Sequence, residues 1–575
     1  MELTGAQIIV ECLKKENVDV IFGYPGGVVI PLFDVLFDEK DINVILPRHE
    51  QAGVHAADGY ARANGKVGVV VVTSGPGATN VVTGIATANM DSVPLVVITG
   101  QVASNMIGND AFQEVDITGI TRPITKHNFL VKDIKDLADT IKKAFHIANT
   151  GRKGPVLIDI PVDISKGKID FTYPDKVELR GYNPNYEGHP GQIKKAIKLL
   201  NEAERPVIMA GGGVIIADAA KELNEFVNKC KVPTTTTLLG LGSLDPSNPL
   251  WLGMPGMHGT YQANYALTDS DLILSVGARF DDRVTGKLST FAPKAKVIHV
   301  DIDPTSISKS VGVDVPIVGD CKNILKDLTK AAKECKIDDW RATVKKWADD
   351  NPPVYDKSSK VIKPQAVIEK ISELTKGDCI IATEVGQNQM WAAQYFKYKY
   401  PRTLLTSGGL GTMGYGFPAA IGAQIAYPDK IVIDIAGDGS IQMNIQELAT
   451  IAAYDLPVKI VILNNGYLGM VRQWQQLFFD RRYSSTCLTK GDSCPENCKS
   501  PKEECLQYIP DFVALAKSYG INGVRVTDPA DIEKVLKEEL FNKKASVMEF
   551  IIDREENVFP MVPAGAAINE IMGMA

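Results

Sequence analysis

The sequence IVIDIAGDGS, residues 431–440, determines how the surrounding part of the chain is expected to fold. Its first six residues are apolar and mostly β-branched apart from one aspartate, which predicts a short strand that ends before Gly437. A second apolar run, VKIVILNNG at residues 458–466, predicts another strand. Between them the apolar positions fit a helix, for which Asn444 and Glu447 have the spacing of a capping box. The stretch therefore predicts a strand–helix–strand unit.

Asp438 and Asn465 follow the ends of these two predicted strands. Because the strands of such a unit are parallel, both residues should lie at the same edge of one sheet. A carboxylate and an amide oxygen at one edge suit a hard divalent cation that also holds a phosphate. Taken separately, Gly-Asp-Gly and Asn-Asn also favour ordinary turns. Together they favour a magnesium and diphosphate site.

The composition is that of a soluble globular protein with several domains. The chain has 575 residues, of which 45% are hydrophobic and 23% charged, and its length suggests three or four domains. The net charge of -7 is spread without long runs, which argues against nucleic acid or an anionic membrane as the main partner. The N-terminus lacks the pattern of a signal peptide, and no run of about 18 apolar residues occurs. A cytoplasmic location is therefore expected.

Strands and helices alternate along three parts of the chain, which predicts three doubly wound, parallel-sheet α/β domains. In the first part, the apolar run at residues 67–73 predicts a central parallel strand. In the second, the predicted strands 206–210, 272–276 and 297–300 each lead into a polar or glycine-rich turn, as in nucleotide-binding sheets. The predicted divisions are a first domain 1–165, a linker 166–191, a central domain 192–340, a linker 341–360, a third domain 361–552 and a C-terminal tail 553–575.

Several motifs identify the chain as similar to a known family. The Gly437-Asp438-Gly439 segment and Asn464-Asn465, with 24 residues between Gly439 and Asn464, match the thiamine diphosphate signature. Together with further motifs, they make the chain, over essentially all 575 residues, resemble the catalytic large subunits of the acetolactate synthase (acetohydroxyacid synthase) family. Those motifs are GYPGG at 23–27, RHEQA at 48–52, TSGPG at 73–77, DAFQ at 110–113, GARFDDR at 277–283 and MVRQW at 470–474.

The resemblance implies an activity, cofactors and partners. Such enzymes decarboxylate pyruvate on thiamine diphosphate and ligate the two-carbon unit to a second pyruvate or to 2-oxobutyrate, for branched-chain amino acid biosynthesis. The implied cofactors are thiamine diphosphate, Mg²⁺ and FAD, with the flavin largely structural. The implied fold has a pyrimidine-binding first domain, an FAD-binding central domain and a diphosphate-binding third domain. The implied assembly is a homodimer or tetramer with the active site at the interface, together with a regulatory small subunit.

The resemblance also assigns roles to residues of this chain. Glu50 would hydrogen-bond the aminopyrimidine ring, and Met413 would help to bend the cofactor. Arg472 and Trp474 would face the second 2-oxo acid. The catalytic set is Glu50, Phe112, Gln113 and Lys126, and the metal set is Asp438, Asn465 and the main-chain oxygen of Tyr467. The thiamine diphosphate set is Gly26, Glu50, Thr73, Pro76, Asn80, Gly386, Gln387, Asn388, Gly411, Met413, Gly437, Gly439, Ser440, Tyr467, Leu468, Gly469 and Met470. The FAD set is Arg152, Gly211, Gly212, Gly213, Thr237, Leu238, His258, Gly277, Arg279, Asp281, Arg283, Asp301, Ile302 and Asp320.

One short segment and two single positions depart from the pattern of the family. The segment from Glu384 to Asn388 reads Glu-Val-Gly-Gln-Asn where Asp-Val-Gly-Gln-His is usual. Asn388 could still donate to a phosphate but cannot carry charge. Val28 replaces a smaller alanine, which would narrow the substrate channel. Ala564 replaces a proline in the tail, which would loosen its closure over the site.

A fourth departure is an apparent insertion of about 20 residues between Ser485 and Asp511, at about 486–510. It contains Cys487, Cys494, Cys498 and Cys505. Their spacing leaves three alternatives open: a four-thiolate zinc or iron–sulfur site, disulfides, or thiols without a ligand.

Other functions compete with this interpretation. A pyruvate oxidase shares thiamine diphosphate and FAD, and a flavin-free catabolic acetolactate synthase shares the carboligation. A simple decarboxylase usually has adjacent histidines, and none of the seven histidines here is next to another. From a different class, the chain could be a catalytically inactive homologue, although Glu50, Asp438 and Asn465 are all present.

Overall fold

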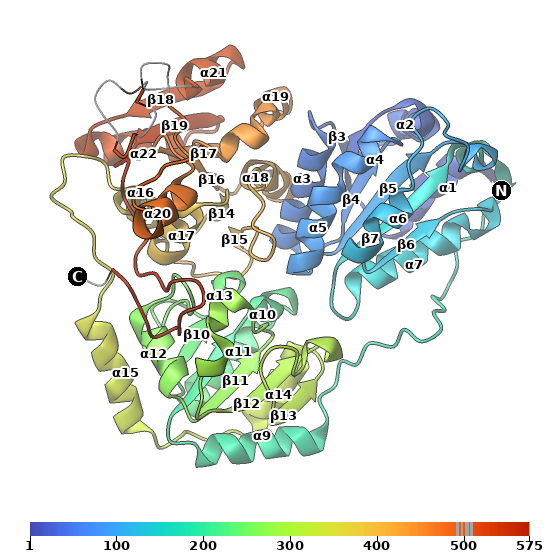
Figure 1. Ribbon diagram of the computed structural model, residues 1–575. Coiled ribbons are helices and arrows are strands. Elements are labelled where there is room, and N and C mark those ends of the chain that lie inside the picture. The colour runs from blue at the N-terminus through green and yellow to red at the C-terminus, as the bar shows by residue number, and fades with distance from the viewer. Residues whose placement is uncertain (490–493, 496–497, 501–504, 506–509, 574–575) are drawn as a thin grey trace.

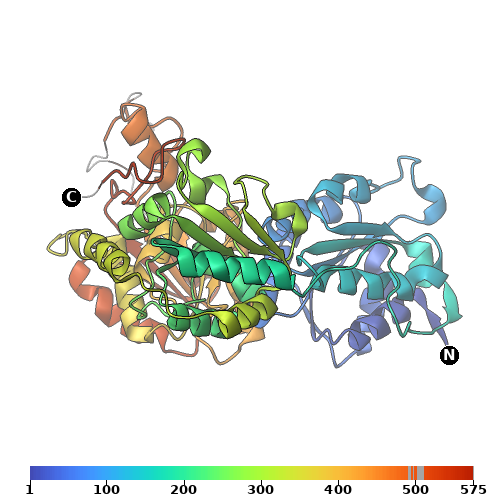
Figure 2. The same ribbon diagram turned by 90° about the horizontal axis from the view of Figure 1, so that it is seen from below.

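Three parallel sheets form the framework of the chain (Figure 1). The computed structural model describes residues 1–489, 494–495, 498–500, 505 and 510–573. Figure 1 shows the first domain beside the third, with the central domain below them, and Figure 2 shows the N-terminus at the outer end of the first domain. The predicted class of three doubly wound α/β domains is confirmed. Among the helices of the described residues, none combines the length and the apolarity that crossing a bilayer requires.

The first sheet has six parallel strands in the order β3-β2-β4-β5-β7-β6. Every residue of its central strands β4, β5 and β7 is buried, and the unbroken apolar sequence of β4 predicts this. The strands are β2 Val20–Tyr24, β3 Asn43–Ile45, β4 Gly68–Val72, β5 Leu95–Gln101, β6 His127–Leu130 and β7 Pro155–Pro161, and the short strands β1 Glu2–Thr4 and β8 Lys168–Asp170 pair antiparallel outside the sheet. Its helices are α1 Gly5–Lys15, α2 Ile30–Asp38, α3 Glu50–Asn64, α4 Pro76–Asn80, α5 Val82–Asp91, α6 Ile117–Thr121, α7 Leu137–Asn149 and α8 Val162–Lys166.

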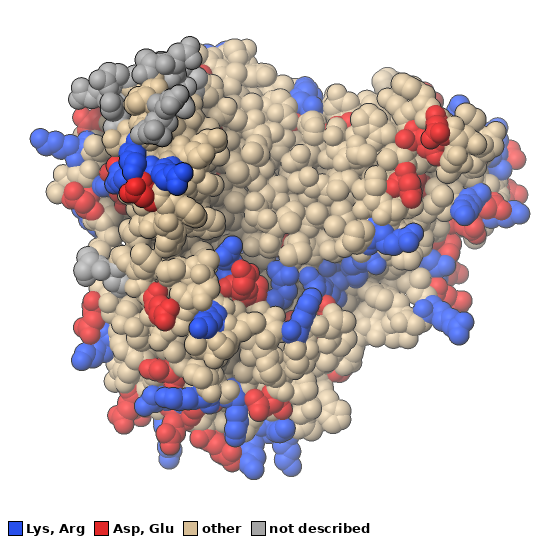
Figure 3. All heavy atoms as spheres, in the orientation of Figure 1, with Lys and Arg blue, Asp and Glu red and all other residues tan. Residues whose placement is uncertain are grey.

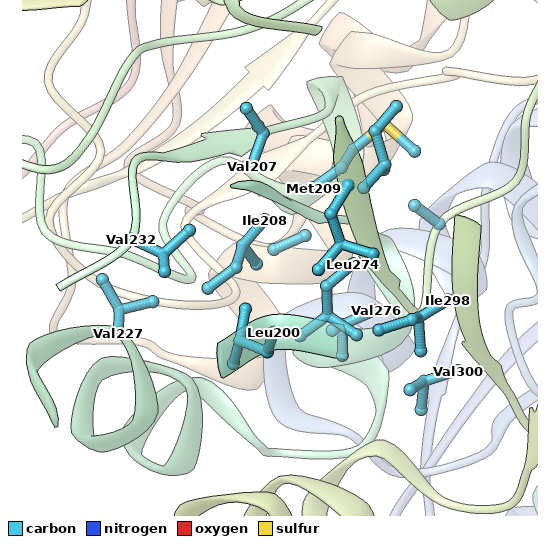
Figure 4. Packing of buried hydrophobic residues seen from close by; sticks show 14 of the residues in the cluster. Leu200, Val207, Ile208, Met209, Val227, Val232, Leu274, Val276, Ile298 and Val300 are labelled. Carbon is cyan, nitrogen blue, oxygen red and sulfur yellow. The ribbon is translucent and has the colours of Figure 1, made fainter. Parts of the chain in front are cut away.

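The central sheet has five parallel strands in the order β10-β9-β11-β12-β13. Figure 4 shows its core, in which side chains of β9, β11 and β12 pack with Leu200, Val227 and Val232. The strands are β9 Pro206–Ala210, β10 Thr234–Thr236, β11 Leu272–Val276, β12 Lys296–Asp301 and β13 Val315–Val318. The helices are α9 Pro190–Glu202, α10 Gly212–Ile216, α11 Ala220–Cys230, α12 Tyr261–Asp269, α13 Asp282–Thr285, α14 Cys321–Ala331 and α15 Asp338–Asp350. Helix α15 buries Trp340 and Val344 in this core, so it crosses the boundary expected at residue 340.

The third sheet has six parallel strands in the order β15-β14-β16-β17-β19-β18. Its strands are β14 Ile380–Thr383, β15 Leu404–Leu405, β16 Val432–Gly437, β17 Lys459–Asn464, β18 Asn522–Val526 and β19 Ser546–Ile551. Its helices are α16 Pro364–Thr375, α17 Gln387–Tyr395, α18 Gly416–Ala426, α19 Leu448–Ala453, α20 Gly469–Phe478, α21 Phe512–Ser518 and α22 Ile532–Leu540. The opening stretch therefore forms β16, and the run that follows it forms β17, as predicted.

The predicted capping box of Asn444 and Glu447 is wrong. The segment between β16 and β17 forms two short 3-10 turns before α19 begins at Leu448, and the Asn444 side chain caps neither turn. Instead, Asn444 donates to the carbonyl oxygen of Gly414, and Glu447 accepts from the main chain of Arg48. These partners are distant in the sequence, so the local spacing could not indicate them.

Helices α3 and α18 join the first and third domains, and they lie side by side in Figure 1. Glycines let their backbones touch: a methyl group on Gly59 would lie 2.1 Å from the carbonyl oxygen of Ala419, and one on Gly422 only 1.8 Å from that of Ala56. A side chain at either position would separate the helices. Since α3 carries Glu50 as its first residue, this contact fixes where the first domain presents Glu50.

We predict that Gly422→Ala destabilises the protein by about 1–3 kcal/mol or more. Inside a helix, alanine is favoured over glycine by about 1 kcal/mol, so helix propensity alone would make the variant more stable. A loss of stability would therefore come from the clash with Ala56. Gly312→Ala is the matched control, because no atom lies within 4 Å of the added methyl group. Thermal unfolding measures the difference, and a variant Gly422→Ala that melts at or above the wild-type temperature would contradict the packing described.

Candidate active site

Asp438 and Asn465 meet at the carboxyl edge of the third sheet. Strands β16 and β17 are neighbours, and Gly437 is opposite Leu463 in their register. The amide of Asn465 donates to Oδ1 of Asp438 at 3.3 Å, and the amide of Tyr467 donates to Oδ1 of Asn465 at 2.9 Å. The prediction that the two residues share one sheet edge is confirmed.

The Asp438 carboxyl is buried in an environment that disfavours its charge. Asp438 is only 4% exposed. Burial raises its pKa to about 7, and the nearby Glu549 carboxylate adds to the shift. Among the described residues, no Lys, Arg or His side chain forms an ion pair with it. A buried carboxylate without a positive partner fits a divalent cation, which would supply the missing charge.

A small cavity of 70 Å³ lies at Asp438 and is kept open by glycines. A methyl group on Gly439 would lie 2.8 Å from the Leu468 side chain, and one on Gly469 2.2 Å from Oε1 of Gln387. The cavity is lined by residues between Val385 and Val471 alone, and these include many of the predicted thiamine diphosphate residues: Gly386, Gln387, Asn388, Met413, Gly437, Gly439, Ser440, Tyr467, Leu468, Gly469 and Met470. Glycines beside a buried acid leave room for a diphosphate and its cation.

Asn388 lies in this cavity but is oriented differently from the expectation. Its amide nitrogen donates to the carbonyl oxygens of Glu384 at 3.2 Å and Ile435 at 2.8 Å. Both hydrogens of that nitrogen are therefore used within the protein. The role expected from the sequence, donation to a phosphate, does not agree with this arrangement.

A second group of predicted residues gathers at the carboxyl edge of the first sheet. Asn80 donates to Oε2 of Glu50 at 2.9 Å, and a methyl group on Gly77 would lie 3.4 Å from Oε1. A methyl group on Gly26 would lie 2.5 Å from Cβ of Thr73. The Thr73 hydroxyl is buried without a hydrogen-bond partner among the described residues. Such an unsatisfied hydroxyl fits a polar ligand at this edge.

The third domain holds the segment that precedes Glu50. Both carboxylate oxygens of Glu447 accept from the amide of Arg48, at 2.9 and 3.2 Å, and Oε2 also accepts from the Thr450 hydroxyl at 2.6 Å. Glu447 is 1% exposed, and burial raises its pKa to about 7. Glu447 is a functional residue that the local sequence does not reveal, because nothing around it indicates a contact 399 residues away.

A large cavity of 760 Å³ lies where the three domains meet. The loops of the central domain approach backbone to backbone there, since a methyl group on Gly211 would lie 2.4 Å from the carbonyl oxygen of Gly277. The volume falls in the range of cofactor sites. Predicted FAD residues that line it are Arg152, Gly212, Gly213, Thr237, Leu238, His258, Gly277, Arg279, Asp281, Arg283, Asp301, Ile302 and Asp320.

The two cavities adjoin. Val385, Gly386, Met413, Met470 and Val471 line both of them. Trp474 and Gly411 also line the large cavity. The structure therefore brings the predicted diphosphate residues, the predicted FAD residues and one predicted substrate residue into one connected region.

Arg472 lines neither cavity, whereas Trp474, its predicted partner in binding the second substrate, lines the large one. The side chain is fully buried, and it donates to Gln476 at 2.6 Å, to the carbonyl oxygen of Glu556 at 2.8 Å and to Asn557 at 2.8 Å. Arg472 therefore anchors the tail in this conformation, rather than facing the cavity.

The tail also crosses to the central domain. The amide of Val562 donates to the carbonyl oxygen of Met257 at 2.8 Å, and that of Lys287 donates to Ala566 at 2.9 Å. The tail therefore lies across elements that line the large cavity. Ala564 lies between these contacts, where looser closure was expected from the sequence.

The remaining predicted catalytic residues lie apart. Phe112 is 87% exposed, and Gln113 has a φ of 60° and packs against Gly75. Lys126 lies at the amino end of β6, at the opposite edge of the sheet from Glu50, and its ammonium donates to the carbonyl oxygens of Ile147 and Thr150. The structure thus brings Lys126 to the end of α7 and not to the Glu50 cluster.

The cysteine-rich insert lies only partly within the described residues. Cys487 contacts the Thr489 hydroxyl at 3.5 Å, and Cys498 donates to the carbonyl oxygen of Ser500 at 3.0 Å. Within the part of the chain that is described, no three His, Cys, Asp or Glu side chains are grouped as metal ligands. Residues 490–493, 496–497, 501–504 and 506–509 of the insert lie outside that part.

Comparisons with known proteins agree with this domain order. Three family profiles of thiamine pyrophosphate enzymes match: the N-terminal TPP binding domain over residues 3–120, the central domain over 193–328 and the C-terminal TPP binding domain over 384–550. An acetolactate synthase large subunit of Haemophilus influenzae is 48% identical over 99% of this chain and 98% of its own length. A probable acetolactate synthase large subunit of Methanocaldococcus jannaschii is 50% identical over 99% and 95%. The acetolactate synthase isozyme 3 large subunit of Escherichia coli is 46% identical over 99% and 98%.

We predict that Glu447→Gln changes how stability depends on pH. The folded protein holds the Glu447 proton more tightly than the unfolded chain, so the stabilisation from that proton is full below about pH 4.5 and is lost as the pH rises to about 7. A glutamine can still accept from Arg48 and can donate to Thr450, but it has no proton to lose. The variant should therefore be more stable than the wild type at pH 8, by up to about 3 kcal/mol, and similar at pH 5.

Thermal unfolding of the cofactor-free protein between pH 5 and pH 8 measures this effect. Glu178→Gln, the same change at an exposed position, is the control and should follow the wild type. If the stability of Glu447→Gln changes with pH as that of the wild type does, the environment assigned to Glu447 is refuted.

Proposed function

The chain belongs to the acetolactate synthase large subunits of the thiamine pyrophosphate enzymes, and we propose that it joins a two-carbon unit from pyruvate to a second 2-oxo acid. With pyruvate the product is 2-acetolactate, and with 2-oxobutyrate it is 2-aceto-2-hydroxybutyrate, both for branched-chain amino acid biosynthesis. The observation that carries the proposal is the buried Asp438, which lies beside Asn465 in a glycine-lined cavity without a positive partner in the described residues.

The third domain would hold the diphosphate end of the cofactor. Thiamine diphosphate, when bound, supplies the electron sink that decarboxylation of a 2-oxo acid requires. Asp438, Asn465 and the main-chain oxygen of Tyr467 would hold Mg²⁺, because their oxygens suit a hard cation. Gly439 and Ser440 would contact the phosphates, and the other third-domain residues of the predicted set would surround the cofactor.

Glu50 would orient and protonate the pyrimidine end. Asn80 holds Oε2 of Glu50 at 2.9 Å, so Oε1 is the atom left to accept or donate a proton at a ring nitrogen. Glu447 holds the preceding main chain and Gly77 leaves space beside Oε1. Together these contacts would keep the carboxyl group in one orientation as the proton moves.

FAD would occupy the 760 Å³ cavity, and the second 2-oxo acid would lie at its junction with the smaller one. The close approach of the Gly211 and Gly277 loops leaves the cavity open to a large cofactor. Trp474 would limit the space for the alkyl group of the second substrate. Phe112 and Gln113 would approach the reacting carbons from a partner chain.

A second copy of the chain would complete the site. The cavity at Asp438 is lined only by third-domain residues, whereas Glu50 belongs to the first domain. Figure 3 shows few charged side chains over the face that these two domains share, and exposed Phe37, Phe112 and Met443 belong to the same two domains. We infer a homodimer or tetramer in which Glu50 of one chain faces Asp438 of another. A regulatory small subunit and a cytoplasmic location remain predictions.

One assay tests the proposed reaction. The protein is incubated with pyruvate, thiamine diphosphate, Mg²⁺ and FAD, and acetolactate, acetyl phosphate and acetaldehyde are measured. We expect acetolactate as the main product. Acetyl phosphate without acetolactate would instead indicate a pyruvate oxidase, acetaldehyde a decarboxylase, and no product an inactive homologue.

We predict that Asp438→Ala and Glu50→Gln fail at different steps. Asp438→Ala should lose retention of thiamine diphosphate, because it removes the carboxylate that would hold Mg²⁺. Glu50→Gln should retain the cofactor but lower kcat by about 10²–10⁴-fold, because the amide cannot exchange a proton. Equilibrium dialysis measures binding and acetolactate formation measures turnover. Glu178→Gln is the control for loss of one carboxylate, and full carboligation by Glu50→Gln would refute the role given to Glu50.

A further inference from the structure

Glu384 is a fully buried carboxylate that binds main-chain amides of another loop. It directly follows β14, and its residue is 0% exposed. Oε2 accepts from the amide of Gly414 at 2.6 Å, and Oε1 accepts from that of Phe417 at 3.1 Å. The side chain therefore binds the amino end of α18, where amide hydrogens have no partner within the helix.

Asp434 lies opposite Ala382, two residues before Glu384, and its carboxyl group accepts from no such amides in the described part of the chain. It lies on β16 beside β14, and neither of its carboxyl oxygens has a hydrogen-bond partner among the described residues. A methyl group on Gly416 would lie 2.4 Å from Oδ1 of Asp434 and 2.4 Å from the amide nitrogen of Glu384, so the groups are packed closely. Burial and the nearby Glu384 raise the pKa of Asp434 well above its usual value. Burial also raises the pKa of Glu384, but main-chain amides bind only the Glu384 carboxylate, and those hydrogen bonds favour its charged form. The charge of the pair is therefore assigned to Glu384.

The loop that Glu384 binds is also held at its other end. Asp91 of the first domain accepts from the amides of Gly408 at 3.0 Å and Gly409 at 2.7 Å. Asn444 donates to the carbonyl oxygen of Gly414 at 2.6 Å. Between these anchors, Gly411 and Met413 line the large cavity, and a methyl group on Gly411 would have no neighbour closer than 3.9 Å. The ends of the loop are fixed, while its middle faces the cavity.

Glu384 thus links two loops of the candidate site. Its main chain leads into the segment Val385–Asn388, which lines the small cavity at Asp438. Its side chain binds the end of loop 408–414, which lines the large cavity. Since loop and segment would surround opposite ends of one cofactor, their separation must match the length of that cofactor.

We propose that the Glu384 carboxylate is a positioning residue that sets the separation of segment 385–388 and loop 408–414, while Asp434 holds the single proton of the pair. The inference rests on the proposed function, because thiamine diphosphate is the ligand that the two segments would hold together. Glu384 would not touch the reacting atoms. It acts through the main chain of Gly414 and Phe417 on one side and of Val385 on the other.

A glutamine cannot replace Glu384 in this role. The two amides bind different carboxylate oxygens, so one of them would face the amide nitrogen of glutamine, donor against donor. Hydrogen bonds to a charged group contribute about 1.5–3 kcal/mol, which corresponds to about 10- to 100-fold in an equilibrium constant. Aspartate retains the charge and both acceptor oxygens but is one methylene group shorter. Asparagine at 434 is a neutral replacement of similar shape for a protonated aspartic acid.

We predict that Glu384→Gln weakens binding of thiamine diphosphate by at least about tenfold, with kcat at saturating cofactor changed less than about threefold. Glu384→Asp should bind with an affinity between those of Glu384→Gln and the wild type, and Asp434→Asn within about threefold of the wild type. Equilibrium dialysis at fixed Mg²⁺ measures binding, and FAD content and thermal unfolding report on the central domain and on folding. The split between affinity and kcat distinguishes positioning from general loss of structure.

Asp271→Asn is the matched control. The two oxygens of Asp271 also accept from two main-chain amides, those of Glu204 at 2.8 Å and Arg205 at 2.9 Å, but in the central domain. This variant should bind thiamine diphosphate as the wild type does. If Asp271→Asn weakens the binding of thiamine diphosphate as much as Glu384→Gln does, the inference is overturned, because the loss would then reflect a general loss of stability.

The remaining outcomes separate the inference from the proposed function. Wild-type affinity in Glu384→Gln, or equal losses in Asp434→Asn and Glu384→Gln, would overturn the inference while the proposed function stands. If Glu384→Gln does not fold, Glu384→Asp decides, since wild-type affinity in that variant would overturn the role of the side-chain length. A wild-type protein that does not bind thiamine diphosphate would overturn the proposed function and this inference with it.

Discussion

The contact between α3 and α18 is the constraint on which the arrangement of the other functional elements depends. Glycines at 59 and 422 allow the two backbones to touch, and the Tyr415 hydroxyl donates to Asp58 at 2.6 Å across the same interface. Arg62 then joins Asp58 to Asp91, which binds the loop at Gly408. Because α3 begins at Glu50 and α18 begins at the loop that Glu384 binds, one helix pair fixes the Glu50 edge relative to loop 408–414 within each chain. A shift at this contact would therefore move the Glu50 edge and loop 408–414 together.

Sequence patterns predicted the parts of the site that depend on the end of a strand, and not the parts that depend on distant partners. Asp438 and Asn465 could be placed together because parallel strands bring their carboxyl ends to one edge. Glu447 and Arg472 could not be placed, since burial decides their roles: Glu447 binds the amide of Arg48, and Arg472 binds the tail at Glu556. Periodicity indicates which face of an element is buried but not what lies opposite it. For the same reason a local capping pattern at Asn444 was wrong, although the strands on either side were right.

Buried carboxyl groups are a shared feature of this region. Glu384, Asp434, Asp438 and Glu447 are at most 4% exposed, and burial raises the pKa of each. Two of them, Glu384 and Glu447, bind main-chain amides and so fix loops. Asp438 alone lies in a cavity, without a positive partner in the described residues. Burial of acids opposes folding, so their concentration here fits a site whose ligands supply the compensating charge.

The lining of the cavity at Asp438 indicates where that charge must come from. Its lining residues include no Lys, Arg or His within the part of the chain that is described, and Asn388 turns its amide nitrogen toward the carbonyl oxygens of Glu384 and Ile435. A diphosphate placed here would face only neutral donors, chiefly the amides at the amino ends of α17 and α20. Helix ends carry partial charges of about half an elementary charge, too little to balance a diphosphate and Asp438 together. The divalent cation at Asp438 would therefore balance most of the negative charge of the diphosphate and Asp438. Cofactor binding in this chain should depend on the concentration of that cation more steeply than in a protein with a cationic side chain at position 388.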